Sequence, residues 1–348
     1  MLILGIETSC DETSAAIVAE DGPQVWSIRS NIVASQADIH REWGGVVPEL
    51  ASRQHIRDIC GVVTGALESA DVTLADVNAV AVTQGPGLIG SLLVGVSFAK
   101  SLAVSLSVPL IPVHHLAGHI ESLCLQHGPL PLPAVVLVVS GGHTSLYVVS
   151  DPGAYRRVGR TRDDAAGEAY DKVAKLLGLG YPGGPVVDRR ARDGHDTSID
   201  LPIARMTHAD RNAPAAKGDL DFSFSGLKTA VLRYVRGRGE PLAEPEIADV
   251  CASFQRSVVE ALLDRLFDAA GRFSARSVGI AGGVSANSRL RRDSAERGAR
   301  LGLPVFVPSL VLSTDNAAMI AAAGLRNFHA GIRAGWDLNA DASLEMFP

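Results

Sequence analysis

The sequence lacks paired cysteines. Its four cysteines stand singly along the chain, at Cys10, Cys60, Cys124 and Cys251, and no two form a C-x-x-C pair. This spacing excludes a zinc ribbon and gives no disulfide framework. Reduced thiols, as in cytosolic proteins, are the simplest interpretation.

Long apolar runs are missing as well. The longest lies within "PAVVLVVS" (133–140) and is too short to span a bilayer. The N-terminal "MLILGIETS" has no basic segment before a short apolar run, so it predicts no signal peptide. We therefore expect a soluble cytoplasmic protein with no membrane partner.

An excess of basic residues is also absent, since 32 Lys and Arg stand against 38 Asp and Glu for a formal charge of -6. This balance argues against a general nucleic-acid coat but leaves room for a local basic patch. The segments "DRRAR" and "RLRR" are locally basic, and "YRRVGRTR" supplies Arg156, Arg157, Arg160 and Arg162. Such arginines either form a solvated face or contact RNA phosphates.

Strand-like and helix-like segments alternate, which predicts an α/β fold. Residues 2–20 read as a hairpin that turns between Thr8 and Thr13, and residues 134–150 read as a second hairpin. Residues 78–103 and 277–302 each read as strand, glycine turn and helix, and residues 163–180 as a helix capped by Asp163 or Asp164. Two similar hairpins so far apart predict a duplicated α/β domain with a cleft between the copies.

Glycine turns follow several predicted strands, although neither a P-loop nor a G-x-G-x-x-G motif is present. The turn "SGGHT" (140–144) can present backbone N–H groups to a phosphate or carboxylate, and "GGVSAN" (282–287) opens a helix whose N-terminus favours anions. The alternative for Gly141 and Gly142 is an ordinary hairpin turn. Together the turns favour a nucleotide-binding cleft.

Three histidines crowd into "HHLAGH" (114–119). His115 and His119 are four residues apart, so a helix would place them on one face. Position 116 is Leu, which removes the glutamate base of an H-E-x-x-H metallopeptidase. Two histidines suit an iron or zinc site if a carboxylate joins them, and Asp315 is a candidate. The alternatives are ordinary helix histidines and a helix-capping aspartate.

Other carboxylates have two interpretations each. Asp11 and Glu12 fall at the tip of the first hairpin, where they either face water or act as a base beside a bound substrate. Asp171 and Asp188 either bind a hydroxyl or amine or simply face solvent.

Nine segments across nearly the whole chain resemble the tRNA adenosine threonylcarbamoyltransferase family, whose members were earlier named O-sialoglycoprotein endopeptidases. They are "GIETSCDETSAAIV", "VVPELASRQH", "TQGPGLIGSLLVG", "HHLAGHIES", "VSGGHTSLY", "DDAAGEAYDKVAKLLGLGYPGGP", "FSFSGLKTAV", "GGVSAN" and "STDNAAMIA". With no kinase-like extension or organelle-targeting segment, the chain is similar to the bacterial form.

The resemblance implies a two-lobed fold of the actin, sugar-kinase and Hsp70 ATPase class with a cleft between the lobes. The first lobe is expected over 1–115, with 310–348 returning to it, and the second over 116–309, with the adenylate and metal segments.

The resemblance also implies the site residues. One divalent metal per subunit, iron or alternatively zinc, is expected on His115, His119 and Asp315. The adenylate substrate is expected on Val138, Val139, Ser140, Gly141, Gly142, Asp171, Gly184, Asp188 and Asn287. Asp11 or Glu12 would take a proton from the attacking amine, and His143 would assist the leaving phosphate.

The implied reaction moves a threonylcarbamoyl group from threonylcarbamoyl-AMP to the exocyclic N6 amine of the adenosine 3′ of the anticodon, in tRNAs that read ANN codons. The implied partners are a paralogue of similar fold (TsaB), a small ATPase (TsaE) and a separate synthase that makes the adenylate (TsaC). The apolar helix expected over Ser91–Leu106 is either the paralogue interface or a helix buried in its own lobe. A metallopeptidase and an ATP-dependent binding module of the actin or Hsp70 type are the rival functions.

Overall fold

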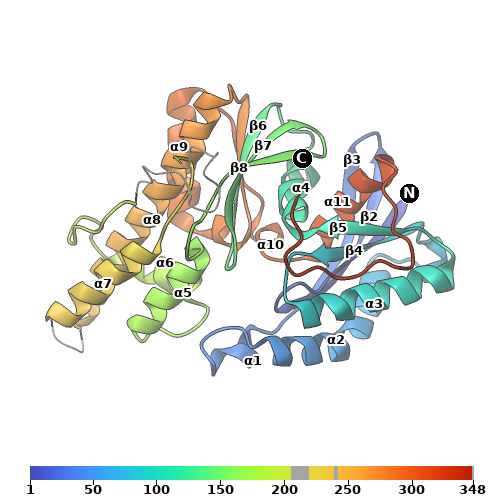
Figure 1. Ribbon diagram of the computed structural model, residues 1–348, viewed down its shortest axis with the longest axis horizontal. Helices are drawn as coiled ribbons and strands as arrows, with labels where there is room; N and C mark the ends of the chain where they lie inside the picture. Colours follow the sequence, from blue (N-terminus) through green and yellow to red (C-terminus); the bar gives the residue numbers. More distant parts are fainter. Residues whose placement is uncertain (205–218, 239–241, 347–348) are drawn as a thin grey trace. The chain divides into compact units, whose positions relative to one another are not determined.

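The computed structural model describes residues 1–204, 219–238 and 242–346 and divides the chain into two compact α/β units (Figure 1). The first comprises Met1–Leu130, Asp151–Tyr155 and Pro308–Pro348, and the second Pro131–Ser150 and Arg156–Val307. The first unit therefore extends past the boundary expected at residue 115. The helix that carries His115 and His119 belongs to this unit, not to the second.

The first unit is built on a five-stranded sheet in the order β3-β2-β1-β4-β5, in which β1, β2 and β3 are antiparallel and β1, β4 and β5 parallel. Its strands are β1 (Leu2–Glu7), β2 (Glu12–Gly22), β3 (Val25–Ser35), β4 (Ala79–Gly85) and β5 (Leu110–His114). Its helices are α1 (Ala37–Arg41), α2 (Pro48–Ser69), η1 (Leu74–Asp76), α3 (Ile89–Leu106), α4 (His115–His127), α10 (Leu310–Ser313) and α11 (Ala317–His329).

The two faces of this sheet are covered by different helices. Alternation along the strands sends Leu4, Ile6 and Val80 to the face covered by α2 and α3. The opposite face presents Gly5 and small alanines to α11, which is itself rich in alanine ("AAMIAAAG"). Small residues on both partners let the α11 backbone lie close to the sheet, and this fixes the position of the chain just before α11.

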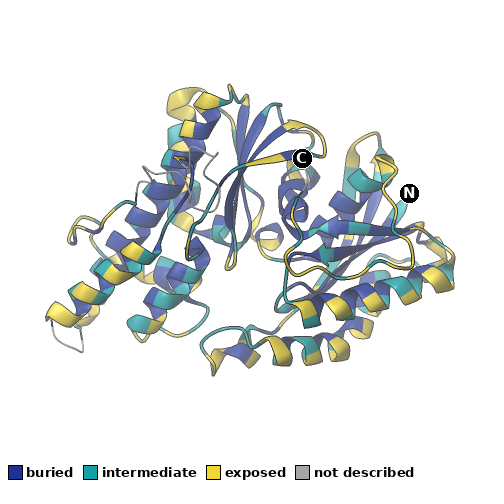
Figure 2. Cartoon of the chain, in the orientation of Figure 1, coloured by how far each residue is buried: buried dark blue, intermediate teal, exposed yellow. Residues whose placement is uncertain are grey.

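The second unit repeats the same topology. Its sheet has the order β10-β9-β6-β7-β8, with β6 and β7 antiparallel and β6, β9 and β10 parallel. Its strands are β6 (Ala134–Val139), β7 (Thr144–Asp151), β8 (Ala154–Arg160), β9 (Ser277–Ala281) and β10 (Val305–Phe306). Its helices are α5 (Ala166–Leu176), α6 (Gly183–Arg190), η2 (Ala191–Asp193), α7 (Ser225–Arg238), α8 (Glu244–Arg272), η3 (Gly283–Ala286) and α9 (Ser288–Leu301). Most of α8 is buried in this unit's core (Figure 2).

Both predicted hairpins form, as β1–β2 and β6–β7, and the matching strand orders confirm the predicted duplication. The helix predicted from residue 163 begins at Ala166, and neither aspartate caps it. Thr144 Oγ1 instead accepts the hydrogen bond from Ala166 N, at 2.9 Å. Asp163 accepts hydrogen bonds from Phe224 N and Ser225 N at the start of α7, so it stabilises a helix some sixty residues away.

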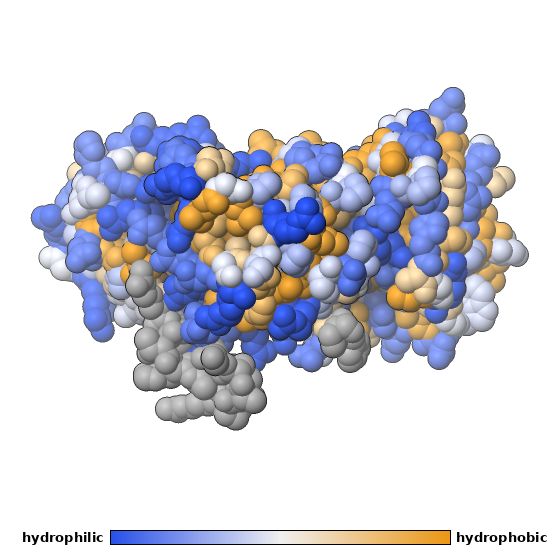
Figure 3. Space-filling model, turned by 90° about the horizontal axis from the view of Figure 1, so that it is seen from above, coloured by the Kyte–Doolittle hydropathy of each residue, from blue (hydrophilic) through white to orange (hydrophobic). Residues whose placement is uncertain are grey.

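Among the described residues, α3 is long and apolar enough to cross a membrane by length and composition alone. In the first unit it packs one face on the sheet through Val96 and Ala99, while Ile89, Leu93 and Val104 are exposed. The outward face of the helix, coloured for exposure in Figure 2, is therefore apolar in part. Apolar side chains also reach the surface shown in Figure 3, where they are mixed with polar ones.

All four cysteines are free thiols.

Gly5 gives a direct test of the close contact between β1 and α11. A Cβ at this position would lie 2.3 Å from Ala317 O, so we expect Gly5→Ala to lower the free energy of unfolding by about 1–3 kcal/mol. Gly61 in α2 has nothing within 4 Å of such an atom, so Gly61→Ala should raise stability by up to about 1 kcal/mol. Urea unfolding of both variants is the measurement. A Gly5→Ala midpoint equal to that of the unsubstituted chain would contradict the packing account.

Candidate functional site

The three clustered histidines have different tasks. His114 is the N-cap of α4: its Nδ1 accepts a hydrogen bond from Leu116 N at 3.1 Å, and its Nε2 donates to Leu344 O at 3.0 Å. His115 and His119 lie in the first and second turns of α4 and are both buried. Their ring centroids are 4.8 Å apart, so both imidazoles face the same small volume, as the four-residue spacing predicts.

Asp315 completes this group of ligand atoms. Its Oδ1 lies 3.1 Å from His119 Nε2 and 3.6 Å from His115 Nε2. One ligand atom from each of the three residues lies within 4.8 Å of the others. Two imidazoles and one carboxylate are the donor set of mononuclear iron and zinc sites. The residues therefore fit a divalent metal ion.

His119 gives a second indication of a metal position. The side chain is fully buried; its Nε2 has only the Asp315 carboxylate beside it, at 3.1 Å, and its Nδ1 makes no hydrogen bond to any residue that the structure describes. Burial of an imidazole nitrogen without a partner is costly, and a metal ion coordinated by one of these nitrogens would lower that cost.

Asp315 stands before α11 but does not cap it. Asn316 is the N-cap, and its Oδ1 accepts the hydrogen bond from Met319 N at 3.1 Å. The capping role that the sequence left open for Asp315 therefore belongs to its neighbour. The α11 helix packs against α4, where Gly118 lies against Ile320, and this contact brings Asp315 to the two histidines.

Glu7 orients His115 through the ring nitrogen that faces away from Asp315. Glu7 Oε2 lies 3.0 Å from His115 Nδ1 and accepts a hydrogen bond from Thr83 Oγ1 at 2.8 Å, while Oε1 accepts one from Ser9 N at 2.5 Å. A carboxylate on the far nitrogen of a ligating histidine fixes the tautomer and raises the basicity of the metal-binding nitrogen. The other ring nitrogen of His115, Nε2, therefore faces Asp315 and is available to bind a metal ion.

Burial alone would lower the pKa of His115, but the carboxylates of Asp315 and Glu7 outweigh it and raise this pKa to about 9. A metal ion has to displace that proton at neutral pH.

Asp11 and Glu12 lie in the same unit, where the turn from β1 ends and β2 begins. Burial, together with the charges of Asp11 and Asp315, raises the pKa of Glu12 well above its usual value. The charge of Asp315 therefore acts on Glu12. With its raised pKa, Glu12 is a stronger base than an exposed carboxylate.

In the second unit, the turns predicted to bind the adenylate follow parallel strands. Ser140 to His143 connects β6 to β7: Ser140 N donates to His143 O at 2.8 Å, and Gly141 and Gly142 are exposed. Gly282 follows β9 with φ +91°, and a Cβ there would lie 2.5 Å from Val139 O. Only glycine fits this approach, so the two turns lie together at the carboxyl ends of β6 and β9.

The remaining adenylate candidates make hydrogen bonds to other residues of the second unit. Asp171 Oδ1 accepts from Gly183 N at 2.7 Å, beside Gly184, and Asp188 Oδ1 accepts from Ser288 Oγ at 2.8 Å. Asn287 donates to Gln255 Oε1 at 2.9 Å and caps α9. Val138 and Val139 are buried strand residues of β6, so of this pair only backbone atoms are available to a ligand.

Some of the arginines considered for RNA contact already form ion pairs within the protein, and others are exposed. Arg162 is paired with Asp221 at 2.9 Å, and Arg289 with Asp196 and Asp293. Arg156 is exposed and stacks on Phe273 with its Cζ 4.9 Å from the ring centroid. Several of the basic residues therefore have protein partners.

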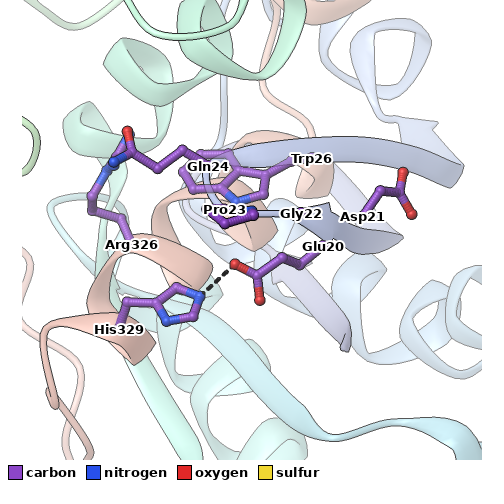
Figure 4. A pocket seen from close by; sticks show the side chains of 8 residues that line it. All are labelled: Glu20, Asp21, Gly22, Pro23, Gln24, Trp26, Arg326 and His329. Carbon is purple, nitrogen blue, oxygen red and sulfur yellow. Dashed lines mark hydrogen bonds and ion pairs between the residues drawn. The ribbon is translucent and has the colours of Figure 1, made fainter.

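A cavity of about 560 Å³ lies elsewhere in the first unit, between the β2–β3 turn and α11 (Figure 4). Trp26, Arg326 and the His329–Glu20 pair line it, and none of the predicted site residues does.

The supporting residues Glu7, Ser9 and Thr83 were missed by sequence reasoning. Glu7 did leave a signal, because it is an ionisable residue that ends an otherwise apolar strand, "LILGIE". Nothing in the sequence indicates that Thr83 would contact it.

Removal of the Glu7 charge should weaken metal binding without abolishing it. We expect Glu7→Gln to raise the dissociation constant for the metal by about 10–100-fold, because His115 loses its orienting carboxylate. Glu20→Gln is the matched control, since it disrupts another glutamate–histidine pair away from the ligands. Competition with a metal chelator at fixed pH measures both. Equal affinity of Glu7→Gln and the unsubstituted chain would refute the orienting role.

The sequence also matches a known family of proteins. The family model TsaD, tRNA N6-adenosine threonylcarbamoyltransferase, matches residues 27–322. The chain is 52% identical over 345 residues to the tRNA N6-adenosine threonylcarbamoyltransferase of Anaeromyxobacter dehalogenans, covering 99% of each chain.

Two solved structures are similar at low sequence identity. HypF of T. kodakarensis has a TM-score of 0.59 at 14% identity, covering 95% of this chain and 47% of that one. Component A of the (R)-2-hydroxyglutaryl-CoA dehydratase of Acidaminococcus fermentans has a TM-score of 0.51 at 16% identity, covering 94% and 96%. These likenesses concern the fold alone, the two-lobed actin-like ATPase fold. By the family model and the relative that matches over the full length, the chain belongs to the tRNA N6-adenosine threonylcarbamoyltransferase family.

Proposed function

We propose that this transferase moves the threonylcarbamoyl group from threonylcarbamoyl-AMP to the N6 amine of the adenosine 3′ of the anticodon, in tRNAs that read ANN codons. The family assignment supports the reaction class. The observation that carries the proposal is that Asp315, some two hundred residues away in the sequence, meets the buried His115 and His119 at one place.

In the proposed reaction the amine nitrogen bonds to the carbamoyl carbon, the bond from that carbon to the phosphate oxygen breaks, and AMP leaves with the electron pair. The metal, which we propose to be iron with zinc as the alternative, supplies Lewis acidity toward substrate oxygens when bound. Glu12 or Asp11 accepts the proton of the amine. The pKa of Glu12, raised by burial and by its acidic neighbours, supports that role.

The second unit would hold the adenylate. Backbone N–H groups of the turn from Ser140 to Gly142 can donate to phosphate oxygens, since both glycines are exposed. Asp171, Gly184, Asp188 and Asn287 would hold the nucleoside, and His143 at the end of the turn would assist the leaving phosphate. Amide donors fixed in advance by the β6–β7 turn need little reorganisation as charge develops.

The rival functions have less support. Leu116 stands where a metallopeptidase of the H-E-x-x-H type has its glutamate, so that mechanism has no base at this position. A nucleotide switch of the actin or Hsp70 type needs no paired histidines beside a carboxylate.

Loss of any proposed ligand should remove both metal and activity. We expect His115→Ala, His119→Ala or Asp315→Ala to lower bound metal below about one tenth per chain and transfer by at least about 100-fold, because two ligands cannot complete the site. His329→Ala, which lies in the separate cavity, should change neither. Metal analysis and transfer of labelled threonylcarbamoyl from synthetic threonylcarbamoyl-AMP to unmodified tRNA are the measurements. Stoichiometric metal in the double variant His115→Ala/His119→Ala would overturn the assignment.

We further propose that the chain works in the cytoplasm with a TsaB-like paralogue and a TsaE-like ATPase, and receives its donor from a TsaC-type synthase. A protein with a net charge of -6 gains little long-range attraction for tRNA, so a partner that completes the tRNA-binding surface is expected. The isolated chain should therefore turn over slowly.

The exposed face of α3 is the proposed contact for the paralogue. Leu93 is 42% exposed, Ile89 50% and Val104 55%, and Ile56 on the neighbouring α2 is also exposed. Val96, by contrast, is only 2% exposed and belongs to the core of its own unit. A charge at Val96 would therefore report on folding and not on the interface.

Leu93→Glu tests this contact. We expect it to weaken binding of the TsaB-like paralogue by at least about tenfold, since it places a charge in an apolar interface, with the free energy of unfolding changed by less than about 0.5 kcal/mol. Leu301→Glu, at an exposed leucine that ends α9, is the matched control and should bind normally. Unchanged affinity of Leu93→Glu by calorimetry would exclude α3 as the contact.

A further inference from the structure

A continuous chain of hydrogen bonds runs through the interior of the first unit, away from the metal ligands. His40 Nδ1 accepts from Val47 N at 3.3 Å, and His40 Nε2 lies 3.3 Å from Gln36 Oε1. Gln36 Nε2 lies 3.3 Å from His55 Nδ1, and His55 Nε2 lies 2.9 Å from Cys10 O. The chain connects the start of α2 to the turn that carries Asp11 and Glu12.

Each group in this chain has one consistent donor or acceptor role. A carbonyl only accepts, so the contact with Cys10 O assigns the proton of His55 to Nε2 and leaves Nδ1 as an acceptor. Nδ1 then accepts from Gln36 and from Thr13 Oγ1, which lies at 2.8 Å. His40, in turn, donates through Nε2 to the amide oxygen of Gln36. All four bonds therefore point the same way, from Val47 N to Cys10 O.

The residues of this chain are almost completely buried. His40, His55 and Thr13 are 0% exposed and Gln36 is 1% exposed. Burial, the largest effect, lowers the pKa of His55, which agrees with a neutral imidazole at this position. Buried polar groups left partly satisfied are costly, so the four bonds act as a unit and hold one arrangement.

The turn itself is held at three successive carbonyls, each by a different element. Ser9 O accepts from Leu88 N at the start of α3 at 2.8 Å, Cys10 O from His55 in α2, and Asp11 O from Gln36 N at 2.9 Å. Two of these are backbone bonds that any residue could make. The bond to Cys10 O is the one that depends on a side chain.

We propose that His55 is a positioning residue for the transfer reaction: through its Nε2–H bond to Cys10 O it holds the turn that presents Asp11 and Glu12 beside Asp315. His55 contacts neither substrate nor metal in this role. The inference rests on the proposed function for its effect on catalysis, but its effect on the turn stands apart from that function. It also assigns a task to "VVPELASRQH", a segment that the proposed mechanism leaves unused.

The test compares three variants in the metal-loaded chain with its partner. His55→Leu keeps the apolar bulk and removes all three hydrogen bonds of His55, whereas His55→Gln can donate to Cys10 O and accept from Thr13. Val63→Ala removes another buried side chain of α2, one that lies outside the hydrogen-bonded chain, and controls for lost stability. The readouts are amide hydrogen exchange of the peptide over residues 8–13, metal content, and kcat and KM for transfer.

We expect His55→Leu to raise exchange of that peptide and to lower kcat by at least about tenfold, with KM changed by less than about twofold and metal content unchanged, because a displaced base slows the chemical step and not binding. His55→Gln should restore most of the slow exchange and most of kcat. Val63→Ala should change neither the exchange of this peptide nor kcat.

Exchange of residues 8–13 in His55→Leu no faster than in Val63→Ala would overturn the positioning role, as would a kcat equal to that of Val63→Ala. If the unsubstituted assembly transfers nothing to tRNA, the proposed function fails, and the exchange comparison still decides whether His55 holds the turn.

Discussion

The hydrogen bond between the buried carboxylate of Glu7 and His115 Nδ1 is the contact on which the candidate metal centre depends. Glu7 ends β1, Thr83 is in β4 and His115 begins α4, so one carboxylate links three elements of the first unit. A buried carboxylate is stable only where donors surround it, and the Ser9 amide, the Thr83 hydroxyl and the imidazole supply them. The orientation of His115 therefore follows from the way the sheet and α4 meet.

The rest of the arrangement depends on small residues at the points where α11 meets the sheet, such as Gly5 and Ala81. Because Gly5 and Gly324 leave no side chain at these contacts, α11 lies close to the strands, and it also lies against α4 at Gly118. Asp315 stands just before α11, and Asn316 takes the capping position. The metal ligands are thus brought together by backbone packing in one unit, while the second unit uses the same topology to place glycine turns at the ends of β6 and β9.

Much of this organisation could be predicted from the residues. Apolar runs and turn residues indicated both hairpins, and the four-residue spacing of His115 and His119 indicated a shared helix face. What could not be predicted depends on distant contacts. Asp163 or Asp164 was expected to cap the helix that follows, but Asp163 has its partners at Phe224 and Ser225, and the local pattern carries no information on such a pairing. Likewise, nothing near Asp315 indicates which histidines it meets, and nothing near Thr83 indicates Glu7. The family resemblance, not spacing, supplied the adenylate residues.

The central claim is that the two histidines of α4 and the aspartate before α11 form one metal site, preorganised by Glu7. A crystal structure of the iron-loaded protein with anomalous diffraction at the iron edge tests it most directly. The account predicts a single anomalous peak about 2.0–2.2 Å from His115 Nε2, a nitrogen of His119 and a carboxylate oxygen of Asp315, with His115 Nδ1 still bonded to Glu7. A fully occupied iron at another position, with His119 unligated, would contradict it.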